Sequence, residues 1–289
     1  MTGTTGIFCQ QMVRWEDSEC IIIGLPWDGT ASGRPGSRFG PEALRVATRQ
    51  VEDYSPYLQR DISKVKLHDA GDIELPFGST DDTLKAIEKS CFPFIREKKK
   101  LVALGGEHLI SWPIVKAMHQ HYGDEIFVIQ LDAHADLREE YLGVRCSHAT
   151  VMHLITELIG QENTAVIGIR SGTYEEWGLL ESHPHFFGGL SSQSLSDFES
   201  LACEILPSRK VYITLDCDVF DPGIFPGTGT PEPGGITFHD FIGIVKALKE
   251  CDIIGADIVE LAPDYDHSGI SNALGATALR ELILAGKKI

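Results

Sequence analysis

The stretch Val128-Ile-Gln-Leu-Asp-Ala-His-Ala-Asp136 begins as an apolar, β-favouring run and ends in three polar residues, Asp132, His134 and Asp136. Side chains two residues apart on a strand point to the same side, so these three groups are predicted to converge at the strand end. A carboxylate, an imidazole and a second carboxylate on one face are what a divalent metal site requires. A polar strand end exposed to solvent is the alternative interpretation of this triplet taken alone.

Similar apolar runs recur along the chain, separated by segments of helical period. They are continuous rather than alternating, which is typical of strands buried on both faces of a sheet. We expect strands at Cys20–Gly24, Val65–His68, Leu101–Leu104, Ile126–Leu131, Ala165–Ile169, Val211–Leu215 and Ile253–Ile258. We expect helices at Asp81–Glu97, Pro113–His121, His148–Leu158, Ser194–Leu206, Thr237–Lys249 and Asn272–Ala285. The alternation predicts a single α/β domain over residues 1–289, with a mostly parallel sheet covered on both faces.

Three irregular stretches interrupt this pattern, at Gly29–Pro41, Gly71–Thr80 and Asp221–Gly235. Long loops on an α/β scaffold are where binding sites are built, and plain surface connections are the alternative. For the first two loops we favour the surface connection. Pro41 is placed as the first residue of a helix.

The composition restricts the partners and the compartment. A formal net charge of −17 disfavours nucleic acid and anionic membranes, and suits either a cationic ligand or simple solubility. No apolar run is long enough to span a membrane, and the first residues lack the basic and apolar regions of a signal peptide. The seven cysteines include no Cys-x-x-Cys motif, which predicts reduced thiols in the cytoplasm.

Two further strands are predicted to end in polar residues of the same kind. Val211-Tyr-Ile-Thr-Leu-Asp-Cys-Asp218 places two aspartates on one face, with Cys217 between them pointing into the core. Leu101-Val-Ala-Leu-Gly-Gly-Glu-His108 runs through two glycines that would let the backbone turn tightly and approach a ligand closely. Because ligands bind at the carboxyl ends of the strands in open α/β sheets, the three motifs are expected to form one site.

These motifs supply enough ligands for two metal ions. The candidate ligands are four carboxylates and two imidazoles: His108, Asp132, His134, Asp136, Asp216 and Asp218. The four carboxylates balance two divalent cations, and six ligands exceed what one tetrahedral zinc ion takes. The oxygen-rich set without cysteine favours a hard or borderline ion, with Mn²⁺ first. A metal pair of this kind can hold a bridging water and lower its pKa to about 7, which gives hydroxide at neutral pH.

At this point the chain resembles the ureohydrolases, the family of arginase and agmatinase, and most closely the bacterial agmatinases. The resemblance rests on Gly105-Gly-Glu-His108, Asp132-Ala-His-Ala-Asp136, Asp216-x-Asp218 with Asp221-Pro222, and Asp257-Ile-Val-Glu260, in the family's order and over nearly the whole chain. It implies a three-layer α/β/α sandwich of the arginase/deacetylase type with eight mostly parallel strands. It also implies a homotrimer or a homohexamer.

The resemblance assigns the ligands to two manganese ions per subunit. One ion would take His108, Asp132, Asp136 and Asp216. The other would take His134, Asp132, Asp216 and Asp218, so that Asp132 and Asp216 bridge the pair.

Three further roles follow from the same resemblance. Glu260 would pair with the substrate guanidinium, which offers a planar fork that a carboxylate meets with both oxygens. His148 would carry a proton to the leaving amine, and Thr230 would lie beside the guanidinium. Asp136 and the metals would stabilise the tetrahedral species. The alternatives are a solvated strand end for Glu260, a residue near a helix cap for His148, and ordinary turn chemistry for Thr230.

The chain departs from the family pattern at three places. It has Glu107 where many members have Asp, Leu109 where they have Ser, and Ala149 where Gly is commoner. We expect the first two to affect only the surroundings of the metal site, and the third to alter how its loop lies. Glu107 is equally consistent with a negative charge at the start of the following helix.

The expected reaction is hydrolysis of agmatine to putrescine and urea by a hydroxide bridging two manganese ions, a step of polyamine biosynthesis. In the segment between Asp136 and His148, Glu139 and Glu140 suit a substrate that ends in an ammonium group, although Arg138 and Arg145 lie in the same segment. A solvated loop explains these charges as well.

Three alternatives remain open. Another guanidino substrate, such as guanidinobutyrate or arginine, would keep the same chemistry, and Arg138 or Arg145 could then meet a carboxylate. A dimetal phosphoesterase is disfavoured because its Gly-Asn-His-Glu motif is missing after the Asp-x-His strand. A non-catalytic metal-binding scaffold is disfavoured because no ligand is missing, and neither is Glu260 or His148.

Overall fold

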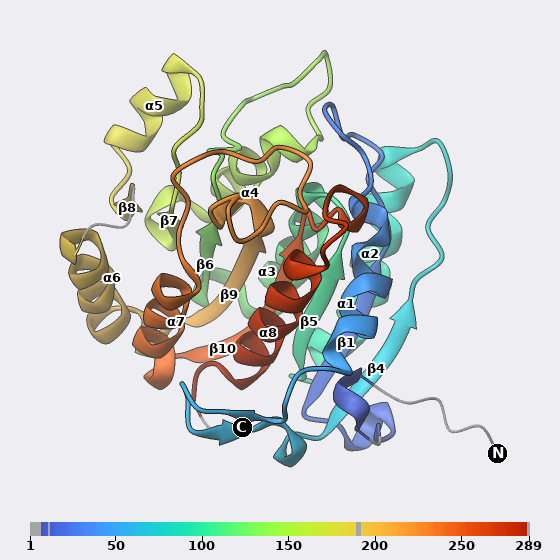
Figure 1. Ribbon diagram of the computed structural model, residues 1–289. Helices are drawn as coiled ribbons and strands as arrows, with labels where there is room; N and C mark the ends of the chain where they lie inside the picture. Colours follow the sequence, from blue (N-terminus) through green and yellow to red (C-terminus); the bar gives the residue numbers. More distant parts are fainter. Residues whose placement is uncertain (1–6, 11, 189–191, 288–289) are drawn as a thin grey trace.

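A computed structural model describes residues 7–10, 12–188 and 192–287 of the chain. Its centre is an eight-stranded sheet in the order β4-β1-β5-β10-β9-β6-β7-β8, in which every neighbouring pair is parallel (Figure 1). The strands are β1 (Cys20–Leu25), β4 (Leu67–Asp72), β5 (Lys100–Gly105), β6 (Ile126–Leu131), β7 (Thr164–Ile167), β8 (Phe186–Phe187), β9 (Lys210–Asp216) and β10 (Asp252–Val259). The predicted α/β class with a mostly parallel sheet is confirmed.

Helices cover both faces of the sheet. They are α1 (Gly40–Thr48), α2 (Thr80–Arg96), α3 (Ser111–Tyr122), α4 (Val151–Ile159), α5 (Tyr174–Glu181), α6 (Ser192–Glu204), α7 (Phe238–Ala247) and α8 (Ile270–Leu284). One core cluster joins the sheet to α1, α6, α7 and α8, and a second joins it to α2, α3, α4 and α5 (Figure 1). None of the helices that the structure describes combines the length and the apolar character that crossing a membrane requires.

The two core clusters follow from the pleat of the strands. In β6, Phe127 and Ile129 belong to the first cluster, whereas Ile126 and Val128 belong to the second. Successive side chains of a strand point to opposite faces, and here both faces are apolar. The continuous apolar runs in the sequence are therefore strands buried on both sides.

The prediction missed the shortest elements and displaced one strand. A two-stranded antiparallel sheet of β2 (Tyr54–Ser55) and β3 (Arg60–Asp61) and the strand β8 are too short to show a periodic pattern. The strand expected at Val65–His68 runs two residues later, at Leu67–Asp72, so the loop expected from Gly71 begins after it. Helix α5 was also missed, because its apolar stripe is weak, although its Thr173-x-x-Glu176 capping box is visible in the sequence.

The strand order brings the candidate site residues together. The strands β5, β10, β9 and β6 are neighbours in the sheet, and His108, Glu260, Asp216 and Asp132 lie at or just beyond their carboxyl ends. Parallel strands end at the same edge, so four segments that are distant in sequence deliver their polar residues to one place.

Gly106 is required by a close approach of two backbones, not by a ligand. A Cβ at this position would lie 1.9 Å from the carbonyl oxygen of Trp27. The Gly106 N–H donates to the carbonyl of Leu25 at 3.0 Å, and its carbonyl accepts from the Glu260 N–H at 2.8 Å. The expectation that the two glycines let the backbone approach a ligand is wrong for Gly106, because the backbone of Trp27 fills the space beside it.

We expect Gly106→Ala to lower the free energy of unfolding by at least about 2 kcal/mol, because backbone atoms on both sides must shift. Urea titration followed by circular dichroism measures the change. Gly178→Ala is the control, since a Cβ there meets nothing within 4 Å and the residue lies inside α5. The control should be neutral or stabilised by up to about 1 kcal/mol. Equal stability of the two variants would contradict the packing described for Gly106.

Candidate metal centre and active-site cavity

The metal-ligand candidates lie in loops that follow the strands. β6 ends at Leu131, and the next N–H, that of Asp132, still donates to the Ile167 carbonyl at 3.1 Å. His134 forms an isolated bridge with Ser171, and Asp136 has a φ of 54°. The expectation that the triplet converges through strand alternation is therefore wrong in its cause. The residues converge because the backbone turns after the strand.

The second aspartate pair is also arranged by a turn. Asp216 ends β9 and is the N-cap of a short 3₁₀ helix, Cys217–Val219, that carries Asp218. The Asp216 carboxylate accepts the Asp218 N–H at 2.9 Å. Cys217 is fully buried between them, as expected for a core residue.

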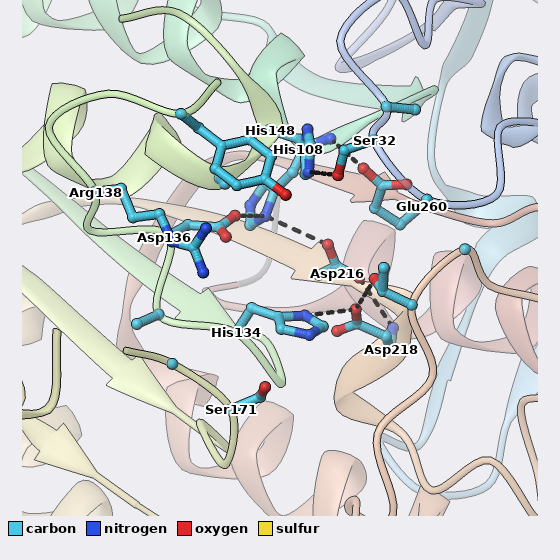
Figure 2. Close-up of a pocket in the computed structure, with 18 of the residues that line it drawn as sticks. Ser32, His108, His134, Asp136, Arg138, His148, Ser171, Asp216, Asp218 and Glu260 are labelled. Carbon is cyan, nitrogen blue, oxygen red and sulfur yellow. Dashed lines mark hydrogen bonds and ion pairs between the residues drawn. The ribbon is translucent and has the colours of Figure 1, made fainter. Parts of the chain in front are cut away.

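His108 is the centre of the first ligand cluster. Its Nδ1 lies 3.0 Å from Oδ2 of Asp132. The same nitrogen lies 3.1 Å from Oδ2 of Asp136 and 3.3 Å from Oδ2 of Asp216 (Figure 2). All four side chains are buried. His108, Asp132 and Asp136 place one ligand atom each within a distance suitable for a shared ion.

His134 is the centre of the second cluster. Its Nδ1 lies 2.9 Å from Oδ2 of Asp218 and 3.8 Å from Oδ1 of Asp132. Asp132 therefore belongs to both clusters, and its two oxygens point to different histidines. A carboxylate in this position can bridge two ions.

The hydrogen bonds of the His108 ring indicate whether a cation fits between its Nδ1 and the three carboxylates. The Thr214 hydroxyl donates to Oδ1 of Asp257 at 2.7 Å, so it must accept from Nε2 of His108, 2.9 Å away. A neutral His108 ring then carries its proton on Nε2 and presents a lone pair on Nδ1. This Nδ1 is buried without a hydrogen-bond partner among the described residues and faces three carboxylates. The arrangement requires positive charge between these groups.

The pKa shifts of His108 and Asp132 show the same excess of negative charge. Burial works to lower the pKa of His108, but the three facing carboxylates outweigh it and raise the pKa well above its usual value. Burial and the charges of Asp136 and Asp218 raise the pKa of Asp132 to about 7. Protons on these groups can supply part of the missing charge, whereas two divalent cations would balance all four carboxylates. The nitrogen and oxygen donor set suits a hard or borderline ion.

A cavity of about 280 Å³ opens above the two clusters, and Glu260 and His148 are among its lining residues. Glu260 has a φ of 60°, and its Oε1 accepts the backbone N–H of His108 at 2.8 Å. Burial and the nearby charge of Glu107 raise the pKa of Glu260 to about 8. A half-buried carboxylate with an oxygen available to the cavity favours a cationic ligand.

His148 and Thr230 also line the cavity. His148 begins a 3₁₀ helix that leads into α4, and burial lowers its pKa. The Thr230 hydroxyl donates to Oδ2 of Asp218 at 3.2 Å. Thr230 therefore contacts a residue of the second cluster, which sequence reasoning did not foresee.

The charged residues that line the cavity differ from those that one interpretation of the sequence placed beside the substrate tail. Glu139 and Glu140 are exposed and do not line it, so they cannot select a substrate tail there. Glu176 of α5 and Arg138 line it instead. The loop at 29–41, for which we favoured a plain surface connection, also contributes Ala31, Ser32, Gly33 and Arg34. The capping box was the only sequence signal for Glu176, and it gives no indication of the cavity.

Comparison with known proteins identifies the family. The model of the arginase family matches residues 18–285. The chain belongs to the arginase family. The agmatinase of Bacillus anthracis is 43% identical over 98% of this chain and 97% of its own length, and that of Bacillus subtilis is 41% identical over 96% and 95%. The crystal structure of a putative agmatinase from Clostridium difficile, 41% identical, aligns with a TM-score of 0.88 over 94% of this chain and 98% of that one.

These relatives confirm three predictions made from the sequence. The resemblance to the ureohydrolases, the arginase-type fold and an enzyme of the amidinohydrolase class are all supported over nearly the full length.

Because Asp132 belongs to both clusters, we expect Asp132→Asn to weaken the binding of both metal ions. We expect at least a tenfold loss of Mn²⁺ affinity (about 1.4 kcal/mol) at both sites. Asp136→Asn should weaken mainly the first site and Asp218→Asn mainly the second. Isothermal titration calorimetry measures both steps, with the exposed Asp124→Asn as the matched control. Two sites of unchanged affinity in Asp132→Asn would contradict a shared ligand.

Proposed function

We propose that this enzyme hydrolyses the guanidinium group of agmatine, releasing urea and putrescine, and thereby serves polyamine biosynthesis. The names of the relatives support the substrate. The observation that carries the chemistry is Glu260, a half-buried carboxylate in a cavity that is also lined by members of the two ligand clusters. A cytoplasmic location, consistent with the free cysteines, and a homotrimer or homohexamer remain predictions.

The residues that would hold two manganese ions are the six that the sequence indicated. We assign His108, Asp132, Asp136 and Asp216 to one ion and His134, Asp132, Asp216 and Asp218 to the other. The two clusters support this assignment except for Asp216 at the second ion, which rests on the resemblance to the ureohydrolases. When bound, two such ions supply an activated water as the nucleophile.

Glu260 would orient the substrate. A guanidinium remains protonated in water and presents a planar fork of N–H donors, which a carboxylate binds with specific geometry. Binding the cation would also compensate the negative charge of the half-buried Glu260. The guanidinium carbon would thus be held directly above the clusters, where attack by water gives a tetrahedral species.

Asp136 and His148 would complete the reaction. Asp136 lies at the cavity floor and would stabilise the positively charged nitrogens of the tetrahedral species. The carbon–nitrogen bond to the tail then breaks, and the departing amine nitrogen takes a proton. His148 lines the same cavity, and its lowered pKa makes its protonated form a ready donor. The hydroxyl proton of the tetrahedral species passes to the same amine nitrogen as the urea carbonyl forms. The proton that water gives up on attack restores the one that His148 donates, so urea and a protonated amine leave the site.

The proposal is tested by urea release from Mn²⁺-loaded enzyme with agmatine, arginine and 4-guanidinobutyrate. We expect agmatine to be hydrolysed and Glu260→Gln to lower kcat/KM by about 30-fold or more, the effect of removing one partner of a buried charged pair. Glu139→Gln should leave activity unchanged, because this glutamate is exposed and outside the cavity. His134→Ala serves as the metal-site control. Absence of urea from all three substrates with two ions bound would overturn the proposal.

A guanidino acid is the second candidate substrate, and Arg138 is the observation that favours it. Figure 2 shows the Arg138 side chain extending towards His134, and it lines the cavity. Its Nε lies 3.4 Å from Oε2 of Glu176, and its guanidinium lies over the Tyr141 ring at 4.7 Å. No described residue accepts a hydrogen bond from its two terminal nitrogens, which are therefore available to a substrate carboxylate.

Glu176 offers little to a competing ammonium group. Its Oε1 accepts the Leu137 N–H at 3.1 Å, and its Oε2 accepts from Thr173 and Arg138. Arg145, the other arginine of this segment, is exposed and paired with Glu157, and it does not line the cavity.

Arg138→Met distinguishes the two substrates. If the carboxylate of 4-guanidinobutyrate binds Arg138, we expect its KM to rise about tenfold or more in the variant, the loss of one charge-assisted hydrogen bond. The KM for agmatine should stay the same or fall, because a positive charge is removed. Arg145→Met is the matched control and should change neither. If wild-type enzyme fails to hydrolyse 4-guanidinobutyrate, this second candidate is excluded.

A further inference from the structure

The loop after β1 contacts the segment that carries His148, although the two are more than a hundred residues apart in sequence. The Thr30 hydroxyl oxygen accepts the backbone N–H of His148 at 3.0 Å. The Ser32 hydroxyl lies 3.2 Å from Nε2 of the His148 ring (Figure 2). The backbone and the ring of His148 are thus held by two residues of one loop.

Glu107 fixes Thr30 in this place. Its buried carboxylate accepts the Thr30 N–H at 2.7 Å with one oxygen and the Thr30 hydroxyl with the other. The Glu107 N–H in turn donates to the Trp27 carbonyl at 2.8 Å, which ties the same loop to the end of β5. Glu107 does not line the cavity, so its carboxylate serves the loop and not a ligand.

Both hydrogen-bonding functions of the Thr30 hydroxyl group are used, so its orientation is fixed. Its hydroxyl proton is used by the Glu107 carboxylate, and its oxygen is used by the His148 N–H. That N–H belongs to the first residue of the 3₁₀ helix His148–Thr150, where no partner within the helix exists. Thr30 therefore satisfies a helix-terminal donor through a tertiary contact.

The His148 ring has few other restraints. Its Nδ1 is buried without a hydrogen-bond partner among the described residues. The Tyr141 ring meets it edge-on, with 5.5 Å between ring centroids and an interplanar angle of 87°. A ring with so few contacts depends on its backbone anchor for its position in the cavity.

We propose that Thr30, held by Glu107, is a positioning residue that sets the place of His148 above the metal centre. This inference rests on the proton-transfer role of His148 in the proposed function. The chain from Glu107 through Thr30 links the loop that begins with the ligand His108 to the proton donor. The positions of the metal-ligand candidate His108 and of the proton donor His148 are thus both fixed relative to the carboxyl end of β5.

The test compares Thr30→Val, which keeps the shape but removes the hydroxyl, with Thr30→Ser, which keeps the hydroxyl. We expect Thr30→Val to lower kcat by about 10- to 100-fold, the usual effect of a misplaced catalytic group, with KM changed less than about twofold. Thr30→Ser should retain nearly full kcat. Thr277→Val, a half-buried threonine on α8 bonded only to its own helix, is the control and should behave as wild type.

A double-mutant cycle separates positioning from a general structural role. In the His148→Ala background, Thr30→Val should cause no further loss of kcat, because the group that it positions is gone. Losses that multiply in the double variant, or an unchanged kcat in Thr30→Val, would overturn the inference. Mn²⁺ content and thermal unfolding of each variant verify the fold, and Thr30→Ala replaces Thr30→Val in the cycle if the latter does not fold. Wild-type enzyme without urea release would instead refute the proposed function.

Discussion

Repulsion among the buried carboxylates at the carboxyl edge of the sheet is the constraint on which the rest of the site depends. Asp132, Asp216 and Asp218 would separate if their oxygens were not held individually. Backbone donors hold them: His134 N–H binds Asp132 at 2.7 Å, Asp218 N–H binds Asp216 at 2.9 Å, and Ala133 N–H binds Asp218 at 3.1 Å. These bonds keep the charges close enough to demand a cation, and the turns that follow β6 and β9 exist to make them.

A second layer of hydrogen bonds fixes the direction of His108. Buried Asp257 in β10 accepts from the Tyr212 hydroxyl at 2.6 Å and from the Thr214 hydroxyl at 2.7 Å, and Thr214 then accepts from His108. The orientation of this imidazole is thus decided by residues inside the sheet that do not line the cavity. Such partners fix the tautomer that a metal ion needs. Hydrogen bonds therefore connect the parallel sheet directly to the loops that carry the ligand candidates.

The cavity combines this fixed floor with walls taken from separate loops. Glu260 and the ligand clusters lie at strand ends or in the turns that directly follow them. Arg138, Tyr141, Ser32 and His148 come from farther along the connections between strands and helices. The floor supplies the groups that the proposed hydrolysis requires. The walls differ in charge and hydrogen bonding, and they are where this chain would discriminate between tails of a guanidino substrate.

The sequence alone determined the α/β class, most of the strands and helices, and the candidate ligand residues. The continuous apolar runs and the strand-end motifs are local patterns that follow directly from burial and from the chemistry of carboxylates and imidazoles. Elements of two residues, such as β2, β3 and β8, carry no such pattern and were not predictable.

Only the tertiary structure decided which groups meet. One interpretation placed Glu139 near the substrate, but this residue is exposed, in agreement with the alternative of a solvated loop. Glu176 was not considered and lines the cavity. Glu107 was expected to affect the surroundings of the metal site, and only the structure shows that its carboxylate holds Thr30. The physical reason is that loop paths have no periodicity. A contact such as that of Thr30 with His148 depends on where two distant turns bring the backbone, and no local pattern encodes that distance.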